Sequence, residues 1–221
     1  MNLARGLERR LENLVDGASA SVFRGRMHPV VIGNKIIRQL DFLVAESLAG
    51  PQIPNDLVVS LNPSDIDSGH DRAALIAELE GVVTETARSN GWRMVGPPSI
   101  HLRTDPAVPK GVLACAGEPV PGPLNPWMHL IADDGSAVLP VSMNRTLIGR
   151  GLDCDIRLSN EQISRRHAIV FTEGASAGII DLASSNGTFV NSRRVGVEPL
   201  TVGPGDHVVL GDLSFTARLV A

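Results

Sequence analysis

Four prolines and two glycines within ten residues interrupt the chain near its middle. They lie in the segment GEPVPGPLNP, residues 117–126 of a 221-residue sequence. Proline fixes φ and lacks a backbone N–H, so this segment continues neither a helix nor a central strand. Its prolines make it semi-rigid. We therefore predict a linker at 117–126 that joins a domain at 1–116 to a domain at 127–221.

Three helices are predicted in the N-terminal half. The second begins at Pro29, which suits a first helical turn, and runs until Gly50 and the proline after it stop it. The third begins after Asp71 as its N-cap and ends at the Asn-Gly pair that includes Gly91. The first is amphipathic because leucines recur at three- and four-residue spacing, at Leu3, Leu7, Leu11 and Leu14.

Extended segments complete this half and make it an α+β domain. Residues 56–61 indicate a strand that is followed by a turn at 62–65. Further short strands are predicted at 92–95, 99–103 and 111–115.

Residues 127–221 show no helical period and predict an all-β sandwich. Turn signals recur every eight to twelve positions, as in sandwiches of short strands. Asp134-Gly135 suits a two-residue hairpin turn. The β-prone segments are MHLIA, AVLPV, TLIGR, IRL, HAIVF, GIIDL, TFVN, HVVLG and SFTARLV.

Composition and charge argue against several classes of protein. The net charge is −4, from 20 basic and 24 acidic residues, whereas a protein that coats nucleic acid needs a basic face. Cys115 and Cys154 have no second Cys or His at ligand spacing, so we expect no metal site, no cofactor and no disulfide framework. No apolar run approaches the ~20 residues of a membrane-spanning helix, and the N-terminus lacks a secretory pattern. We expect a cytoplasmic protein.

Polar residues gather in three loops of the predicted sandwich. The loops carry Gly149-Arg150, then Ser164-Arg165-Arg166-His167, then Ser185-Asn186-Gly187-Thr188 followed by Asn191. Each loop adjoins a predicted strand and therefore lies at an end of the sandwich. Taken singly, none of the three indicates a function.

Taken together, in this order and at these spacings, the loops resemble those of the forkhead-associated (FHA) domain. The matching segments are TLIGR, DIRLSNEQISRRHAIV, IIDLASSNGTFVN and VGPGDHVVLG, and the resemblance covers 127–221. It implies a β-sandwich that binds phosphothreonine peptides and prefers phosphothreonine to phosphoserine. Ser192 departs from the family pattern, which more often has Gly after the Asn of this turn.

The resemblance assigns five residues to the phosphopeptide, and their chemistry suits that ligand. Phosphothreonine carries about −1.5 to −2 charges and three acceptor oxygens, and a guanidinium matches phosphate geometry. Arg150 is expected to contact the phosphate, with Ser164 as a hydroxyl donor and Arg165 as a second charge. Asn186 offers a donor and an acceptor to the peptide main chain, and Ser185 assists.

Five more residues are expected to shape the site. Gly149 is expected to allow the backbone bend that presents Arg150. In the family, the histidine at the position of His167 holds the phosphate-binding loop by hydrogen bonds. A catalytic Ser/His pair is not indicated, because no orienting acid stands at identifiable spacing and no Gly-x-Ser-x-Gly elbow is present. We therefore expect no catalytic residue and no enzyme. The five shaping residues are Gly149, His167, Gly187, Thr188 and Asn191.

Two arginines have alternative interpretations. Arg150 can instead form a surface ion pair with Asp153 or Asp155. Arg166 is expected to face solvent or a partner, with phosphate contact as the alternative.

The layout of the whole chain is similar to that of FHA-domain proteins of Actinobacteria and related Gram-positive bacteria, which carry a domain of unknown function ahead of the FHA domain. The segments LERRLENLVDG, VFRG and ARSNGWRMVGPPSIHL carry this likeness. It implies a setting of bacterial Ser/Thr kinases and of cell-wall or division control. The basic residues of the first helix, Arg5, Arg9 and Arg10, indicate a solvated face, with nucleic-acid or anionic-membrane contact as the alternative.

We thus predict an adaptor that binds a phosphothreonine-containing kinase or kinase substrate, without nucleic acid or a transmembrane segment, and that such a partner can recruit to a membrane. The alternative is a structural or oligomerising protein whose FHA fold does not read phosphate. The linker predicts that the two halves bind separately. In the rival arrangement, the N-terminal half covers the phosphate loops or supplies Thr84 or Thr86 as an internal ligand.

Overall fold

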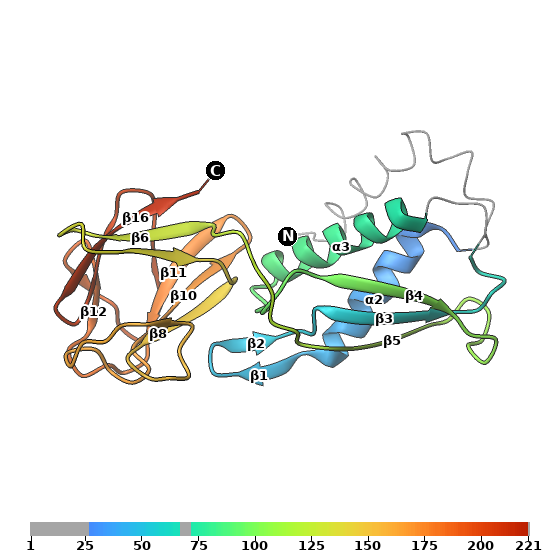
Figure 1. Ribbon diagram of the computed structural model, residues 1–221, viewed down its shortest axis with the longest axis horizontal. Coiled ribbons are helices and arrows are strands. Elements are labelled where there is room, and N and C mark those ends of the chain that lie inside the picture. Colours follow the sequence, from blue (N-terminus) through green and yellow to red (C-terminus); the bar gives the residue numbers. More distant parts are fainter. Residues whose placement is uncertain (1–26, 67–71, 221) are drawn as a thin grey trace. The chain divides into compact units, whose positions relative to one another are not determined.

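The computed structural model describes residues 27–66 and 72–220 (Figure 1). The first predicted helix, its basic residues and Asp71 lie outside these ranges. The chain forms two compact units and passes between them five times. The domain boundaries drawn from the sequence stay a prediction. The first unit holds the segments up to Ala45, Ile53–Ser89 and Met94–Gly122, and the second holds Glu46–Gln52, Asn90–Arg93 and the chain from Pro123.

The first unit is a three-stranded sheet with two helices, which confirms the α+β prediction. Its helices are α2 (Pro29–Leu43) and α3 (Arg72–Ser89), and its sheet has the order β4-β3-β5. β3 (Asp56–Leu61) runs parallel to β4 (Ser99–Thr104) and antiparallel to β5 (Leu113–Glu118). Every second residue of β3 is buried, so one face of the strand lies in the core. Figure 1 shows both helices against this sheet.

The second helix is shorter than predicted. It ends at Leu43, and Val44 is extended. A hairpin follows, in which β1 (Ala45–Ser47) pairs with β2 (Gly50–Gln52). Gly50 has a φ of +104°, a conformation that glycine adopts without steric cost. The glycine therefore closes a hairpin turn where the sequence pattern predicted the end of a helix.

Two strand predictions in this half also need correction. Residues 92–95 form no strand, and only Arg93 makes an isolated bridge, to Gln52. The strand predicted at 111–115 begins at Leu113, because Gly111 lies in a turn at φ +72°. The third helix does end before the Asn-Gly pair, where Gly91 has φ +62°.

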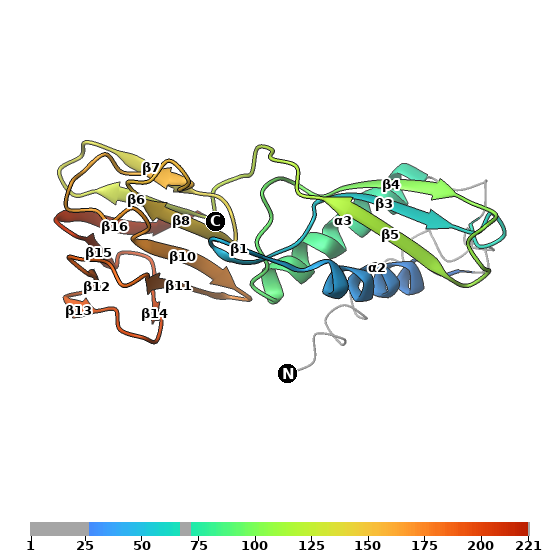
Figure 2. The ribbon, with the colours of Figure 1, turned by 90° about the horizontal axis from the view of Figure 1, so that it is seen from below.

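The second unit contains a β-sandwich, as predicted. Its six-stranded sheet has the order β13-β12-β15-β16-β6-β7, which Figure 2 shows from β7 at the top to β13 at the bottom. The other sheet has the order β14-β11-β10-β8-β9. The strands are β6 (Met128–Ala132), β7 (Val138–Val141), β8 (Arg145–Gly149), β9 (Ile156–Arg157), β10 (Ala168–Glu173), β11 (Ser176–Asp181), β12 (Thr188–Val190), β13 (Arg193–Arg194), β14 (Leu200–Thr201), β15 (His207–Leu210) and β16 (Leu213–Leu219).

The first hairpin of the sandwich has a longer turn than predicted. Pairing of β6 with β7 ends at Ile131 and Val138, so the connection exceeds two residues. Asp134 accepts the backbone N–H of Ser136 through its carboxylate, which fixes the turn around Gly135. A side-chain hydrogen bond from Ser136, and after it this backbone bond, lower the pKa of Asp134.

Both faces of β8 and β10 are covered. Ile148 and Val170 belong to the core between the two sheets. The alternate residues Leu147 and Ile169 point to the other face, where they are buried with Ala49 of the β1–β2 hairpin. The hairpin therefore forms part of the unit that holds the candidate site. None of the helices in the described ranges is long and apolar enough to cross a membrane.

Candidate functional site

The end of β8 lies directly against the loop before β10. The backbone N–H of Arg150 donates to the carbonyl of Ser164 at 3.0 Å, and that of Gly151 donates to the carbonyl of Arg165 at 2.9 Å. A Cβ atom on Gly149 would stand 2.3 Å from the carbonyl oxygen of Arg165. Glycine is needed here because two backbones approach closely. The first two predicted loops are thus joined.

The guanidinium of Arg150 is exposed and has no hydrogen bond or ion pair with any residue that the structure describes. The alternative interpretation, an ion pair of Arg150 with Asp153 or Asp155, is wrong. Asp153 is paired with Arg166 at 2.8 Å, and Asp155 is paired with Arg93 at 2.6 Å. A hydrogen bond from Arg166 lowers the pKa of Asp153. Arg150 is therefore available to an anionic ligand.

Ser164 connects the second loop to the third. The backbone N–H of Ser185 donates to Oγ of Ser164 at 3.0 Å. Since Ser164 Oγ is an acceptor in that bond, its hydroxyl hydrogen is left to donate elsewhere. The backbone N–H of Ser164 donates to Nδ1 of His167 at 3.1 Å.

His167 is fully buried and holds all three loops. Its backbone N–H donates to the carbonyl of Ile148. Because Nδ1 accepts from Ser164, Nε2 carries the proton and donates to the carbonyl of Gly187 at 3.1 Å. Burial lowers the pKa of His167, although the Gly187 carbonyl and the charge of Asp181 act in the other direction. These contacts match the holding role that the FHA resemblance implies.

Asn186 is fixed by a residue that the sequence did not indicate. Its Nδ2 donates to the backbone carbonyl of Gln162 at 2.8 Å and to Gln162 Oε1 at 2.7 Å. Both amide hydrogens are then engaged. Asn186 presents an acceptor, Oδ1, to a ligand, whereas the sequence predicted a donor as well. Gln162 lies between β9 and β10 in a segment without periodicity, so no pattern marked it.

The turn before β12 contains a buried polar network. Gly187 has φ +84°, and its N–H donates to Ser184 Oγ at 3.0 Å. Thr188 Oγ1 and Ser184 Oγ both donate to Asp181 Oδ1, at 2.7 and 2.6 Å. Asp181 and Ser184 were not predicted as site residues. The sequence did contain a signal for this turn, because an Asp three residues before a Ser is typical of turns capped by side-chain hydrogen bonds.

Asn191 fixes a different turn, the one between β12 and β13. Its Nδ2 donates to Asp206 Oδ1 at 2.8 Å, and its Oδ1 accepts the backbone N–H of His207. The N–H of Gly203 and the amide of Asn191 together lower the pKa of Asp206. Ser192, the departure from the family pattern, has φ +67°. That conformation favours glycine.

A cavity of about 650 Å³ lies beside these loops. Leu152 projects into solvent with 85% of its surface exposed, and Arg165 lies on the neighbouring loop. The hollow combines an apolar side chain with positive charge next to Arg150. It is lined by Gly151, Leu152, Asp153, Arg165 and Arg166.

Known protein families match both the N-terminal and the C-terminal part of the chain. The family model "FhaA, N-terminal domain" matches residues 5–116, half of the chain. The chain belongs to the FhaA N-terminal domain family. The FHA domain model matches residues 146–211 of the same chain. Both family resemblances stated from the sequence are therefore confirmed.

Relatives of this FhaA-type chain include several mycobacterial proteins. EmbR, a transcriptional regulatory protein of Mycobacterium tuberculosis, is 38% identical over 95 residues, which are 43% of this chain and 24% of EmbR. The FHA domain-containing protein FhaA of the same organism is 35% identical over 88 residues, 39% of this chain and 16% of FhaA. The matched region is thus about a quarter of the length of EmbR and less than a fifth of the length of FhaA.

A further curated relative and one solved structure match the same region. The glycogen accumulation regulator GarA of Mycolicibacterium smegmatis is 41% identical over 66 residues, 30% of this chain and 40% of GarA. The crystal structure of the FhaA FHA domain, complexed with an intracellular domain of another protein, is 35% identical. The match covers 41% of this chain and 99% of the crystallised FhaA FHA domain, with a TM-score of 0.38.

Proposed function

We propose that this chain is a phosphothreonine-dependent adaptor, which binds a phosphorylated protein through its FHA domain. The observation that carries the proposal is the exposed Arg150 side chain: its backbone is bonded to Ser164, and its guanidinium has no hydrogen bond or ion pair in the described ranges. A phosphate monoester needs a cation and hydroxyl donors, and the joined loops carry both an available guanidinium and a free hydroxyl hydrogen.

Each residue of the proposed site has a separate role. Arg150 and Arg165 bind the dianion by charge-assisted hydrogen bonds, and the hydroxyl of Ser164 donates to another phosphate oxygen. Asn186 accepts a backbone N–H of the peptide through Oδ1, which its bonds to Gln162 orient. Ser185 supports the site through its bond to Ser164. His167, Gly187 and Thr188 hold the loops, Gly149 admits the second loop, and Asn191 fixes the turn beyond them.

The partner class follows from the ligand and from the relatives. A phosphothreonine arises from a Ser/Thr kinase, so the partner is a kinase or one of its substrates, and cell-wall or division control is the proposed setting. The match to regulators such as EmbR and GarA supports a signalling role. We place the protein in the cytoplasm, with membrane-bound partners able to recruit it, and assign it no enzymatic activity and no nucleic-acid ligand.

The first experiment removes the proposed phosphate contact. A degenerate phosphothreonine-peptide library screened on the full chain supplies the peptide. Arg150→Ala should then weaken binding of that peptide at least tenfold, because loss of a charge-assisted bond to phosphate costs on the order of 2–4 kcal/mol. Isothermal titration calorimetry measures the change.

The control is Arg218→Ala, which removes an exposed arginine from β16 of the other sheet. Its affinity should equal that of the unmodified chain. If Arg150→Ala binds as tightly as this control, the proposed site is wrong, and a structural or oligomerising role becomes the better reading.

A further inference from the structure

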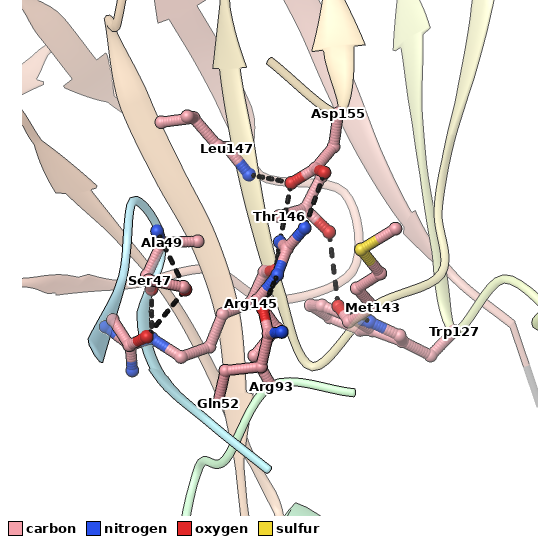
Figure 3. Close-up of polar contacts among 11 residues, drawn as sticks. Ser47, Ala49, Gln52, Arg93, Trp127, Met143, Arg145, Thr146, Leu147 and Asp155 are labelled. Carbon is pink, nitrogen blue, oxygen red and sulfur yellow. Dashed lines mark hydrogen bonds and ion pairs between the residues drawn. The ribbon is translucent and has the colours of Figure 1, made fainter. Parts of the chain in front are cut away.

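Arg93, which follows α3 in the sequence, belongs to the same compact unit as the loops that carry Arg150, Ser164 and Asn186. Its guanidinium binds Asp155 in a bidentate pair, with Nη1 2.6 Å from Oδ2 and Nη2 2.7 Å from Oδ1 (Figure 3). The two side chains are only 11% and 16% exposed. A nearly buried pair of this geometry fixes both groups strongly, because either charge alone would be poorly solvated.

Asp155 closes the loop that carries Arg150. Its Oδ2 accepts the backbone N–H of Leu147 at 2.8 Å, and its own N–H donates to the carbonyl of Leu147 at 2.9 Å. The loop leaves β8 after Gly149 and returns at Asp155. Arg150, the first residue of that loop, therefore has its position set partly by how firmly Asp155 is held.

Arg93 also contacts the opposite end of β8. Nη1 donates to the carbonyl of Arg145 at 2.6 Å, and Nε donates to Gln52 Oε1 at 3.1 Å. One guanidinium thus connects the first residue of β8, the end of the loop at 150–155 and the β1–β2 hairpin. Figure 3 shows these side chains converging.

The hairpin and the segment at 90–93 are held on the sandwich by further bonds. Arg145 Nε donates to the carbonyl of Ala49 at 2.6 Å, and the Arg145 guanidinium lies 5.3 Å from the centre of the Phe171 ring. Asn144 Nδ2 donates to the carbonyl of Trp92 at 3.0 Å. Neither segment lies within the span 146–211 that matches the FHA domain model.

We propose that Arg93 is a positioning residue for phosphopeptide binding, and that residues 46–52 and 90–93 form part of the binding module. Arg93 acts through Asp155. Without the guanidinium, the carboxylate turns toward water, its bond to Leu147 weakens, and the loop loses the geometry that presents Arg150. The effect on affinity rests on the proposed function of Arg150, but the effect on the loop does not.

The affinity experiment uses the full chain and the library-selected phosphothreonine peptide. Arg93→Ala should weaken binding roughly three- to tenfold, which lies within the range of coupling carried through a contiguous side-chain network. Arg93→Lys should recover only part of this, because an ammonium cannot form the bidentate pair. Arg218→Ala serves again as the control. Titrations are made at a temperature at which each variant is folded, so that lower global stability alone leaves the affinity unchanged.

A second measurement needs no ligand. Hydrogen exchange of the free chain should quicken at the backbone amides of Leu147 and Asp155 in Arg93→Ala, and remain unchanged in Arg218→Ala. If Arg93→Ala does not fold, Asp155→Asn takes its place, because it keeps an acceptor for Leu147 but removes the paired charge.

The outcomes separate the two proposals. Faster exchange together with weaker binding supports both. Unchanged exchange and unchanged affinity in Arg93→Ala overturn the positioning role, even if Arg150→Ala abolishes binding. Faster exchange with unchanged affinity also overturns it, since the loop then loosens without consequence for the ligand. If the unmodified chain binds no phosphopeptide, the proposed function fails, and with it the assignment of Arg93 to ligand binding.

Discussion

At the scale of single residues, His167 determines whether the three loops can be held together. Nδ1 must be unprotonated to accept from Ser164, while Nε2 must carry a proton to reach Gly187. Only the neutral imidazole meets both requirements. The same burial that excludes water from the ring lowers its pKa.

This protonation state predicts a pH dependence of stability. The pKa of His167 in the unfolded chain is about 6.5, and its folded-state value is lower. The stability is therefore complete above about pH 6.5 and is lost as the pH falls below that value toward the folded pKa. We expect the free energy of unfolding to decrease between about pH 7.5 and about pH 5.5, and to decrease less in His167→Gln.

Urea unfolding followed by tryptophan fluorescence measures this. The chain has two tryptophans, Trp92 and Trp127, and both belong to the second unit, so the signal reports that unit. An equal pH response in His167→Gln and in the unmodified chain would show that another group is responsible.

Most residues of the candidate site could be proposed from the sequence, because the FHA pattern places them at fixed spacings. Their hydrogen-bond state could not. Asn186 has both amide hydrogens bound by Gln162, and Arg150 is available because Arg166 and Arg93 take the neighbouring carboxylates. These facts depend on which side chains meet in space, and no local pattern encodes that.

At the scale of elements, the β1–β2 hairpin is the largest departure from the sequence prediction. The apolar pattern after Pro29 continues beyond Leu43, where α2 ends. The sequence therefore showed no helix-ending residue before Gly50. A signal for the hairpin's role was nevertheless present. The runs TLIG and AIVF are apolar at successive positions, which is typical of strands covered on both faces. They indicated a covering element for β8 and β10 but not its identity.

Gly50 allows a direct test of the hairpin. Its φ is +104°, and an added Cβ would lie 2.7 Å from Nε of Arg145. Gly50→Ala should destabilise the second unit by about 1–3 kcal/mol through backbone strain and displacement of Arg145. The control is Gly196→Ala, where an added Cβ meets nothing within 4 Å. Urea unfolding by tryptophan fluorescence compares them, and equal stabilities would mean that the hairpin does not depend on this turn.

At the scale of the whole molecule, the chain passes between two compact units five times. The proline-rich segment was recognisable from composition alone. The composition gave no sign that Glu46–Gln52 and Asn90–Arg93 belong with the sandwich, because that depends on contacts between residues far apart in sequence. A chain that begins near Pro123 would lack the cover over Leu147 and Ile169. We therefore expect such a fragment to bind the phosphopeptide more weakly than the full chain, in contrast to the separate binding that the linker predicts.

The central claim is that the exposed loops read a phosphorylated threonine. Calorimetric titration of the full chain with three versions of the library-selected peptide tests it most directly, with phosphothreonine, phosphoserine or unmodified threonine at the central position. We predict clear binding of the phosphothreonine peptide, several-fold weaker binding of the phosphoserine peptide, since burying one methyl group contributes about 0.8 kcal/mol, and no detectable binding of the unmodified peptide. Equal affinity for the phosphorylated and unmodified threonine peptides would contradict the claim.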